Sequence, residues 1–269
     1  MSENKTMNQM ERPNTRTTLH DEFVQLGVDT GMVVLVHSSL RSLGWVCGGP
    51  VAVIQALMDV VGEEGTIVMP TQTGDNSDPK DWGNPPAPES WWPIIREEIP
   101  AFDPRLTPTR GMGRISETFR NFPRVVRSNH PTYSFAAWGK HATDIVSEQP
   151  LTAGFGSSSP LAKMYDLGAL ILLLGVGHES NTSLHLAEHA VEQKTMVQKG
   201  TALVENGKRV WKIYQELEYD ADPFETLGKE FEENHSIRRG KIGMAQSKLI
   251  DQRSMIDFAE VWLNNQQVK

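Results

Sequence analysis

His185, Glu188 and His189 have the types and spacing needed for chemistry on one face of a helix. They lie at positions i, i+3 and i+4, so a helix brings the three side chains within reach of one another. A histidine beside a carboxylate can act as a general base, because its ordinary pKa of about 6.5 is close to neutral pH. The same segment also spells H-x-x-E-H, in which two histidines bind zinc and the glutamate activates water. An ordinary helix surface, a general base and a zinc site all fit this pattern.

Three polar clusters follow apolar runs: His37-Ser-Ser39, the segment after Pro70, and the stretch from His178 to His189. In open α/β sheets, ligands bind outside the carboxyl ends of the strands, where such loops converge. The clusters are therefore expected to share one cleft. The first of them presents hydroxyl and N–H groups that suit a phosphate or a carbonyl, although the segment alone is better explained as a polar turn.

Two common kinds of site lose support. Ser38 and Ser39 lack the surrounding G-x-S-x-G pattern of a hydrolase nucleophile, and Gly111-Met-Gly113 lacks the third glycine and the preceding strand of a dinucleotide site. A string of acids, Glu216, Glu218, Asp220 and Asp222, could hold the ammonium groups of a polyamine, although such a string usually forms a solvated surface.

The elements that must position these residues indicate an α/β fold. Residues 32–36 and 66–70 form short apolar runs on either side of a helical pattern over 51–61, and this strand–helix–strand unit predicts a parallel sheet. Residues 169–176 form another buried strand, and Asn206-Gly207 predicts a hairpin. Helices are expected at 19–26, 114–122, 161–165, 184–191 with Asn181 or Thr182 as cap, 224–233 and 255–264.

The chain is expected to form one domain over residues 17–269 after a flexible polar tail at 1–16. Within it, residues 71–110 carry Trp82, Trp91 and Trp92 among many prolines. This stretch is too long and too aromatic for a simple connector, so it predicts an inserted, loop-rich binding lobe.

The amino-acid composition limits the kinds of molecule that the protein is expected to bind. The 269 residues include 26 basic and 34 acidic side chains, for a net charge of −8, which argues against nucleic acid and suits a cationic small molecule. The single cysteine, Cys47, cannot form an internal disulfide. The polar start and the absence of any apolar run near 20 residues predict a cytoplasmic protein that does not cross a membrane.

Six segments lie in a register that covers nearly the whole chain, from about residue 18 to residue 259. They are His37-Ser-Ser-Leu-Arg-Ser-Leu-Gly44, Met69-Pro-Thr-Gln72, Thr109-Arg-Gly-Met-Gly113, Arg127-Ser-Asn-His-Pro131 with Ser134 and Gly139, Ser159-Pro160, and Ser180-Asn-Thr-Ser-Leu-His-Leu-Ala-Glu188. Together they resemble the aminoglycoside 3-N-acetyltransferase family. The resemblance implies a three-layer α/β/α sandwich of the antibiotic N-acetyltransferase type with a smaller substrate-binding lobe, distinct from the common acetyltransferase superfold. It also implies acetyl transfer from acetyl-CoA to the 3-amino group of 2-deoxystreptamine aminoglycosides, which confers antibiotic resistance, without a metal.

The resemblance also implies roles for particular residues. His185 is the general base, Glu188 is its neighbour, and Glu216 or Glu218 helps to orient the histidine or the drug amine. Asp75, with Glu216 and Glu218, is expected near the substrate. The coenzyme A contacts carried over from the family are His37, Ser38, Ser39, Leu40, Arg41, Ser42, Leu43, Gly44, Thr109, Arg110, Gly111, Met112 and Gly113.

The implied mechanism is direct attack by the amine. An aliphatic amine is mostly protonated at pH 7, so a base must remove a proton as the amine approaches the carbonyl. Donors near Ser38 or Thr109 would hold the oxyanion, and Cys47 lies outside the family's chemical segments. A zinc hydrolase, an acetyltransferase for another amine, and a binding protein without turnover remain alternatives. The sequence indicates neither a preferred aminoglycoside nor an oligomeric state.

Overall fold

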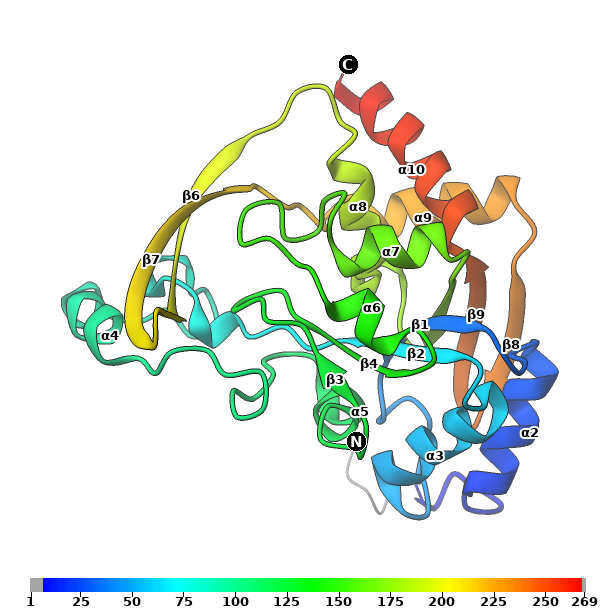
Figure 1. The fold of residues 1–269 in the computed structure, drawn as a ribbon. Coiled ribbons are helices and arrows are strands. Elements are labelled where there is room, and N and C mark those ends of the chain that lie inside the picture. The colour runs from blue at the N-terminus through cyan, green and yellow to red at the C-terminus, as the bar shows by residue number, and fades with distance from the viewer. Residues whose placement is uncertain (1–6, 268–269) are drawn as a thin grey trace.

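A seven-stranded sheet, with the strand order β3-β4-β2-β1-β5-β9-β8, forms the centre of the molecule (Figure 1). The computed structural model describes residues 7–267. β2, β1 and β5 run parallel, whereas β4 and β9 pair antiparallel on either side of them. The strands of this sheet are β1 Val33–Ser38, β2 Thr66–Pro70, β3 Val126–Arg127, β4 Phe135–Gly139, β5 Leu170–Leu174, β8 Arg238–Ile242 and β9 Ala245–Asp251.

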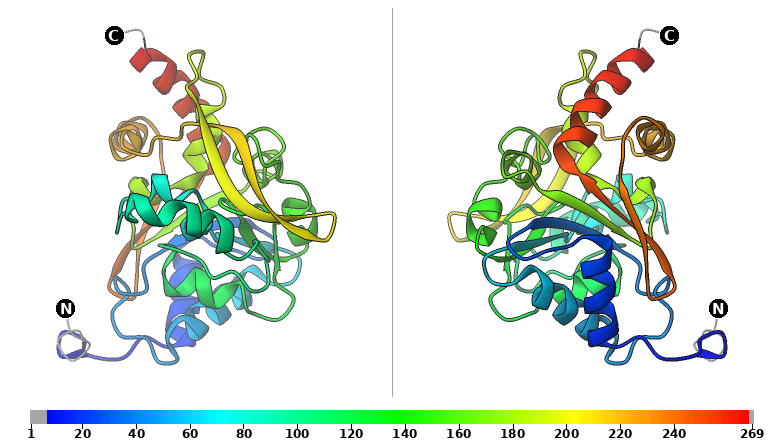
Figure 2. Two further views of the ribbon diagram at one scale, coloured as in Figure 1. Left: turned by 90° about the vertical axis from the view of Figure 1, so that its left-hand side faces the viewer. Right: turned by 90° about the vertical axis from the view of Figure 1, so that its right-hand side faces the viewer.

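Helices cover both faces of the sheet, as Figures 1 and 2 show. Side chains alternate along a strand, so Val34 and Val36 of β1 pack in one core while Val33 and Leu35 pack in the other. α2, α3 and α5 contribute to the first core, and α6 to α10 cover the opposite face. The expected three-layer α/β/α arrangement is confirmed. The helices are α2 Arg16–Leu26, α3 Gly49–Val61, α4 Trp92–Glu98, α5 Gly113–Phe119, α6 Ala142–Val146, α7 Pro160–Asp166, α8 His185–Glu188, α9 Phe224–Asn234 and α10 Gln252–Gln267.

The segment before His185 differs from the sequence prediction. The helix expected at 184–191 is reduced to the four residues of α8, preceded by two 3-10 turns, η4 His178–Ser180 and η5 Thr182–Leu184. Leu184 occupies the N-cap position of α8, and within the described residues neither Asn181 nor Thr182 caps it through its side chain. The side chain of Asn181 is therefore free for another role.

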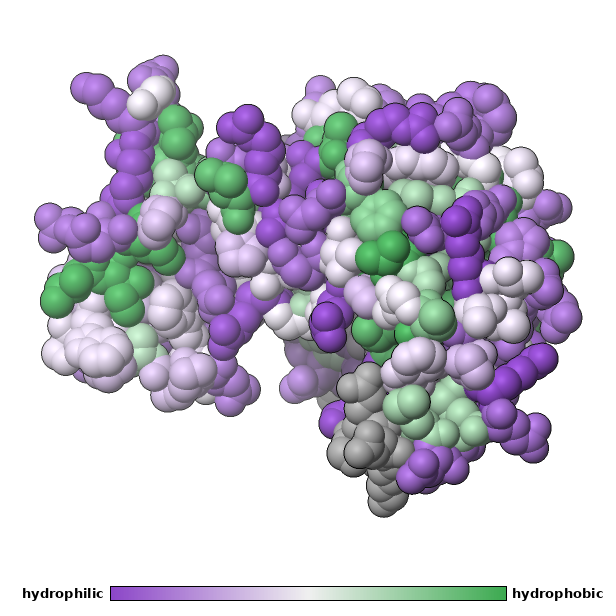
Figure 3. Space-filling view, turned by 90° about the horizontal axis from the view of Figure 1, so that it is seen from below, coloured by the Kyte–Doolittle hydropathy of each residue, from purple (hydrophilic) through white to green (hydrophobic). Residues whose placement is uncertain are grey.

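A two-stranded hairpin stands apart from the main sheet. β6 Met196–Glu205 and β7 Lys208–Leu217 turn at Asn206 and Gly207, whose φ angles of 51° and 75° confirm the predicted turn. The loop-rich segment 71–110 packs against this hairpin, and the two form the left-hand part of the molecule in Figure 3. We call their junction the lobe–hairpin contact. Segment 71–110 contains α4 and the 3-10 turns η1 Gly74–Asn76, η2 Pro79–Asp81 and η3 Glu89–Trp91.

One donor side chain anchors the lobe–hairpin contact. The amide Nδ2 of Asn76 donates to Thr201 Oγ1 and to the carbonyl oxygen of Ala202, each at 3.1 Å. Thr201 Oγ1 in turn donates to the carbonyl oxygen of Asn76 at 2.6 Å. Because both residues are buried, each bond forms away from competing water. None of the helices within residues 7–267 is long and apolar enough to cross a membrane.

Candidate active site

The polar clusters that follow the strands lie at one edge of the sheet. β1 and β5 are parallel, and Ser38 pairs with Leu174, so the loops after both strands start side by side. Two adjoining cavities, of about 780 Å³ and about 320 Å³, open among these loops. They share a wall formed by Ser38, Gly111, Met112, Val176 and Ser180. We call the pair the strand-end cleft.

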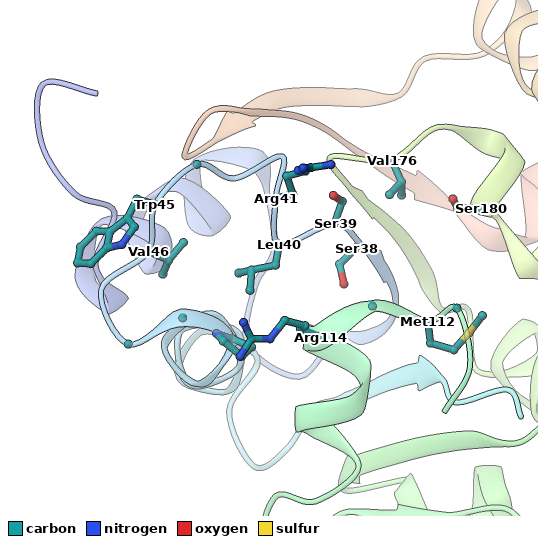
Figure 4. Close-up of a pocket in the computed structure, with 16 residues that line it drawn as sticks. Ser38, Ser39, Leu40, Arg41, Trp45, Val46, Met112, Arg114, Val176 and Ser180 are labelled. Carbon is teal, nitrogen blue, oxygen red and sulfur yellow. The ribbon is translucent and has the colours of Figure 1, made fainter. Parts of the chain in front are cut away.

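Many of the predicted coenzyme contacts line the larger cavity of this cleft. Arg41 and Arg114 lie on opposite sides of Leu40 and Ser38 in Figure 4. Neither arginine has a carboxylate partner among residues 7–267, so both charges are available to an anion. Arg114 was missed by the sequence analysis, although it directly follows the Thr109–Gly113 segment. The predicted residues that line this cavity are Ser38, Ser39, Leu40, Arg41, Gly44, Gly111, Met112 and Gly113.

Four predicted coenzyme residues are occupied elsewhere. Leu43 is fully buried in the core, and Ser42 Oγ bonds Ser39 Oγ at 2.9 Å. The N–H and hydroxyl of Thr109 both donate to Glu117 at 2.8 Å, which leaves that hydroxyl with no proton for an oxyanion. Arg110 pairs with Asp75 at 3.4 Å on the surface. These residues shape or support the loops, because their polar groups are used within the chain.

The smaller cavity contains His185 together with buried polar atoms that the protein does not pair. His37 Nε2, Ser38 Oγ, and both Oδ1 and Nδ2 of Asn181 have no hydrogen-bond partner among residues 7–267. All three residues line this cavity. We call these four atoms the open polar atoms. Burial, together with the charge of His185, lowers the pKa of His37 to about 3, so its imidazole is neutral at pH 7.

His185 is held in one orientation. Its Nδ1 lies 2.5 Å from Glu188 Oε2, so Nδ1 donates to the carboxylate and the neutral ring carries its lone pair on Nε2. Glu188 Oε1 accepts the N–H of Asp220 at 2.8 Å, which fixes the carboxylate. The imidazole stacks on Phe155, with centroids 5.0 Å apart and planes at 9°, and Phe224 lies at 4.9 Å. The ring can therefore present Nε2 as a base with little loss of entropy.

Glu216 contacts the chain rather than His185. Its carboxylate accepts the N–H groups of Ala153 and Gly154 at 3.0 Å, and Tyr219 OH donates to it at 3.1 Å. Burial raises the pKa of Glu216, although these hydrogen bonds oppose the shift. Because Gly154 precedes Phe155, Glu216 fixes the loop whose ring stacks on His185. The fully buried carboxylate is not exposed to a drug amine, and its link to His185 runs only through this loop, so the orienting role of Glu216 stays a prediction.

Glu218 and the second histidine, His189, have surroundings different from those of His185. Glu218 is exposed and lines a cavity of about 790 Å³ with Asp220, Asp222 and Glu188. His189 Nε2 lies 2.8 Å from Tyr219 OH, while burial and the nearby Lys194 and His185 lower the pKa of His189 to about 4. His185 and His189 therefore bond different partners. Within the described part of the chain, no three His, Cys, Asp or Glu side chains group as metal ligands.

Several known proteins are similar to this chain in sequence and in fold. A family model described as aminoglycoside 3-N-acetyltransferase matches residues 35–264. The chain is 51% identical to the SPbeta prophage-derived aminoglycoside N(3')-acetyltransferase-like protein YokD of Bacillus subtilis, over 96% of this chain and 95% of that protein. The crystal structure of YokD matches with a TM-score of 0.97 and 49% identity over 99% of each chain.

Two solved structures with bound ligands are also similar. AAC-IIIb with CoASH matches with a TM-score of 0.85 and 29% identity, over 95% of this chain and 98% of that chain. AAC-VIa bound to sisomicin matches with a TM-score of 0.85 and 30% identity, over 95% of this chain and 99% of that chain.

Proposed function

The chain belongs to the aminoglycoside 3-N-acetyltransferase family, and we propose that it transfers acetyl from acetyl-CoA to the 3-amino group of 2-deoxystreptamine aminoglycosides. In this proposal the amine attacks directly and His185 is the general base. The observation that carries the proposal is the His185–Glu188 pair. His185 lines the smaller cavity of the cleft, which adjoins the larger cavity that contains Arg41 and Arg114. One cavity is suited to proton transfer and the other to an anionic nucleotide.

The larger cavity fits a coenzyme A nucleotide in size and charge. At about 780 Å³ it is within the range of small-molecule sites, and Arg41 and Arg114 supply the cations that phosphates need. Ser38 and Ser39 offer hydroxyl groups between these arginines and the smaller cavity. CoASH bound to the similar AAC-IIIb supports the same donor here.

The chain's own residues then carry the proton. Acetyl-CoA, when bound, supplies the thioester carbonyl that an amine attacks and the thiol that leaves. The amine reacts in its neutral form, after its ammonium proton has passed to solvent. As it attacks, His185 Nε2 accepts one of the two remaining protons on nitrogen while Nδ1–H stays hydrogen-bonded to Glu188, whose negative charge stabilises the imidazolium that forms. The same imidazolium afterwards returns its proton to the departing sulfur, so His185 ends each cycle neutral. Glu216 acts as a positioning residue through Phe155.

The acceptor side is acidic. Glu218, Asp220 and Asp222 line the cavity of about 790 Å³ that Glu188 also borders, and the whole chain carries a net charge of −8. Carboxylates attract ammonium groups, so we propose that these acids and Asp75, at the edge of the lobe, draw cationic sugars to the protein. The amine that is acetylated must enter the smaller cavity of the cleft, because His185 lines that cavity and does not line the cavity of about 790 Å³. Sisomicin bound to the similar AAC-VIa supports an aminoglycoside acceptor.

The direct test follows thiol release from acetyl-CoA against a panel of aminoglycosides, with the acetylated position located by NMR. We expect stoichiometric thiol and monoacetylated drug, acetylated at the 3-amino group, and raised drug resistance in cells that express the chain. His185→Asn keeps a donor for Glu188 but no base, so this matched variant should release almost no thiol. No thiol release from the wild type with any aminoglycoside would overturn the proposed acceptor. Stoichiometric zinc with chelator-sensitive activity would instead favour a metal-dependent hydrolase.

A further inference from the structure

Asn181 is a fully buried amide that the protein leaves entirely unpaired. Its side chain is 0% exposed, and neither Oδ1 nor Nδ2 has a hydrogen-bond partner among residues 7–267. The backbone of Asn181 is nevertheless well held. Its N–H donates to His178 O at 2.9 Å, and its carbonyl accepts the N–H of Leu184 at 3.1 Å. The side chain is therefore set in place by two 3-10 turns and contributes nothing that pairs within the fold.

An unpaired buried amide is costly, so its presence calls for a reason. Burying a polar group without a partner costs about 1 to 3 kcal/mol, and most buried polar groups in proteins are paired. A helix cap would have supplied a partner, but Leu184 occupies the N-cap position of α8. Unpaired polar groups that survive in a rigid site are typical of positions where a ligand completes the hydrogen bonds.

The position of Asn181 identifies which ligand group it faces. It lines the cavity of about 320 Å³ with His185, four residues later, and with Ser38 at the end of the neighbouring strand β1. Ser180, its neighbour, lines both this cavity and the larger one. Asn181 thus stands between the proposed nucleotide side and the proposed base. Only the reacting end of an acyl thioester needs to reach that point.

We propose that Asn181 is a catalytic residue whose Nδ2 donates a hydrogen bond to the carbonyl oxygen of the acetyl thioester. This inference rests on the proposed function and deepens it. As the amine lone pair forms the new C–N bond, the carbonyl π pair moves to oxygen, where Nδ2–H meets the negative charge. On collapse the C–S bond breaks, its electron pair leaves with sulfur, and sulfur takes the proton from His185. The products are the N-acetyl amine and free coenzyme A thiol.

A fixed amide suits this task for a physical reason. Preorganised donors stabilise developing charge most when they are buried and need not reorient during the reaction. His178 anchors the turn that carries Asn181, since its Nε2 bonds Glu232 at 2.7 Å and its N–H bonds Glu225 at 3.0 Å. The donor is therefore held by the α9 side of the fold, independently of His185.

The test compares Asn181→Leu and Asn181→Asp with Ser183→Ala. Both Asn181 variants conserve size and remove the donor. Ser183 is a matched control because it lies in the same turns, is fully buried and has an unpaired Oγ within the described residues, but does not line either cavity of the cleft. Loss of one such donor typically lowers kcat by about 10² to 10³-fold. We expect this loss in both Asn181 variants, a similar KM for acetyl-CoA, and near-normal kcat in Ser183→Ala.

Stability gives the readout that separates catalysis from structure. Asn181→Leu removes an unpaired buried amide and should keep or raise the melting temperature while kcat falls. The acid limb of its pH–rate profile should remain that of the wild type, because His185 is untouched. A kcat within about threefold of the wild type in Asn181→Leu would overturn the inference, since loss of an oxyanion donor typically costs about 10² to 10³-fold. A melting temperature that falls in parallel with kcat would assign Asn181 to the fold instead.

A binding measurement keeps this inference separable from the proposed acceptor. Calorimetry of acetyl-CoA and of coenzyme A, without any amine, reports whether the protein recognises the acetyl group. The wild type and Ser183→Ala should prefer acetyl-CoA, and Asn181→Leu should lose that preference. If no aminoglycoside is acetylated but the preference behaves in this way, the acceptor is wrong and Asn181 stands. If the ratio of acetyl-CoA affinity to coenzyme A affinity is the same in the wild type and in Asn181→Leu, and kcat is unchanged, the role of Asn181 is rejected while the proposed acceptor stands.

Discussion

The strand-end cleft and the lobe–hairpin contact handle buried polar groups in opposite ways. At the contact, Asn76 Nδ2 reaches two acceptors on the hairpin, and Thr201 Oγ1 bonds back to the Asn76 carbonyl. In the cleft, Asn181 and His37 are similarly buried but carry three of the four open polar atoms. The two regions therefore contain similar side chains at similar depth, with and without protein partners.

This difference indicates what each region is for. A buried polar group that is paired within the fold holds two elements together, and its loss leaves a partner unsatisfied. A buried polar group that is unpaired destabilises the fold. It gains a hydrogen-bond partner only when a ligand binds, as at preorganised sites. Replacing residues of the cleft should thus affect turnover or ligand affinity, whereas replacing residues of the contact should affect stability.

The largest expected effect is on turnover in the cleft. His185→Ala should lower kcat by about 10² to 10⁴-fold, or roughly 3 to 5 kcal/mol of transition-state stabilisation, because the proposed general base is lost. Coenzyme A affinity should be retained, and the residual rate should rise with pH as free amine becomes available. Steady-state kinetics and calorimetry measure both quantities.

His189→Ala is the matched control for that variant. His189 bonds Tyr219 and not Glu188, so its loss should reduce kcat far less. Equal and near-complete losses in both variants, accompanied by loss of a bound metal, would instead indicate that the two histidines are zinc ligands.

The next effect is on stability at the lobe–hairpin contact. Asn76→Ala removes a buried donor that bonds Thr201 Oγ1 and Ala202 O, so the free energy of unfolding should fall by about 2 kcal/mol. Urea denaturation measures this, and calorimetry should show unchanged coenzyme A affinity. Asn121→Ala serves as control, because Asn121 is exposed and bonds only its own helix region. A larger effect on coenzyme A affinity than on stability would break the distinction between the two regions.

The sequence predicted the central strands of the sheet better than the two strands, β9 and β8, at one side of it. β1, β2 and β5 are continuous apolar runs because both of their faces are covered, and Asn206-Gly207 supplies the positive φ angles that a tight hairpin requires. β8 and β9 were missed. β8 is an edge strand with the sequence Arg-Arg-Gly-Lys-Ile, and exposed edge strands carry charge rather than a buried pattern.

The candidate site was predicted in part for similar reasons. The i, i+3 spacing of His185 and Glu188 is local, so it survives in the single turn of α8. The partners of Glu216 lie more than sixty residues earlier, at Ala153 and Gly154, and such long-range contacts have no signature in the local pattern. The open amide of Asn181 was likewise beyond reach, because asparagine before a helix is a normal capping residue.

A smaller effect is expected on ligand affinity at the mouth of the cleft. Arg114→Ala should weaken coenzyme A binding about tenfold, or about 1.4 kcal/mol, since a charged contact to phosphate is lost. Binding by this variant should also depend less on salt, because one exposed charge pair fewer is screened.

Bulky replacements of Ser38 and Ser39 should weaken coenzyme A binding sterically. Arg124→Ala is the control, because Arg124 is an exposed arginine paired with Glu63 away from the cleft. Unchanged affinity in all the cleft variants would remove the nucleotide from this cavity.

The last effect concerns the pH dependence of stability, and it involves both regions. Burial lowers the pKa of His130, next to the lobe, to about 4, and that of His37, in the cleft, to about 3. Below pH 6.5 the unfolded chain binds protons at these residues while the folded chain does not, so the free energy of unfolding falls as pH decreases. Each imidazole contributes at most about 1.4 kcal/mol per pH unit. Carboxylates with a lowered pKa, such as Glu117 and Glu232, lose their stabilising effect only below about pH 4.5, so they do not contribute between pH 6.5 and pH 5.

His130→Asn sharpens this last comparison. His130 Nδ1 accepts the N–H groups of Thr132 and Tyr133, at 3.1 and 2.9 Å, and the Oδ1 of asparagine can take the place of that acceptor without titrating. Urea denaturation at pH 6.5, 5.75 and 5 should therefore give a shallower pH slope for His130→Asn than for the wild type. Bound coenzyme A should leave the His130 contribution unchanged, because that residue is outside the cleft, but should alter the contribution of His37, which lines it. Equal slopes for the wild type and His130→Asn would mean that His130 accepts a proton in the folded state, and that burial there is less complete than its contacts indicate.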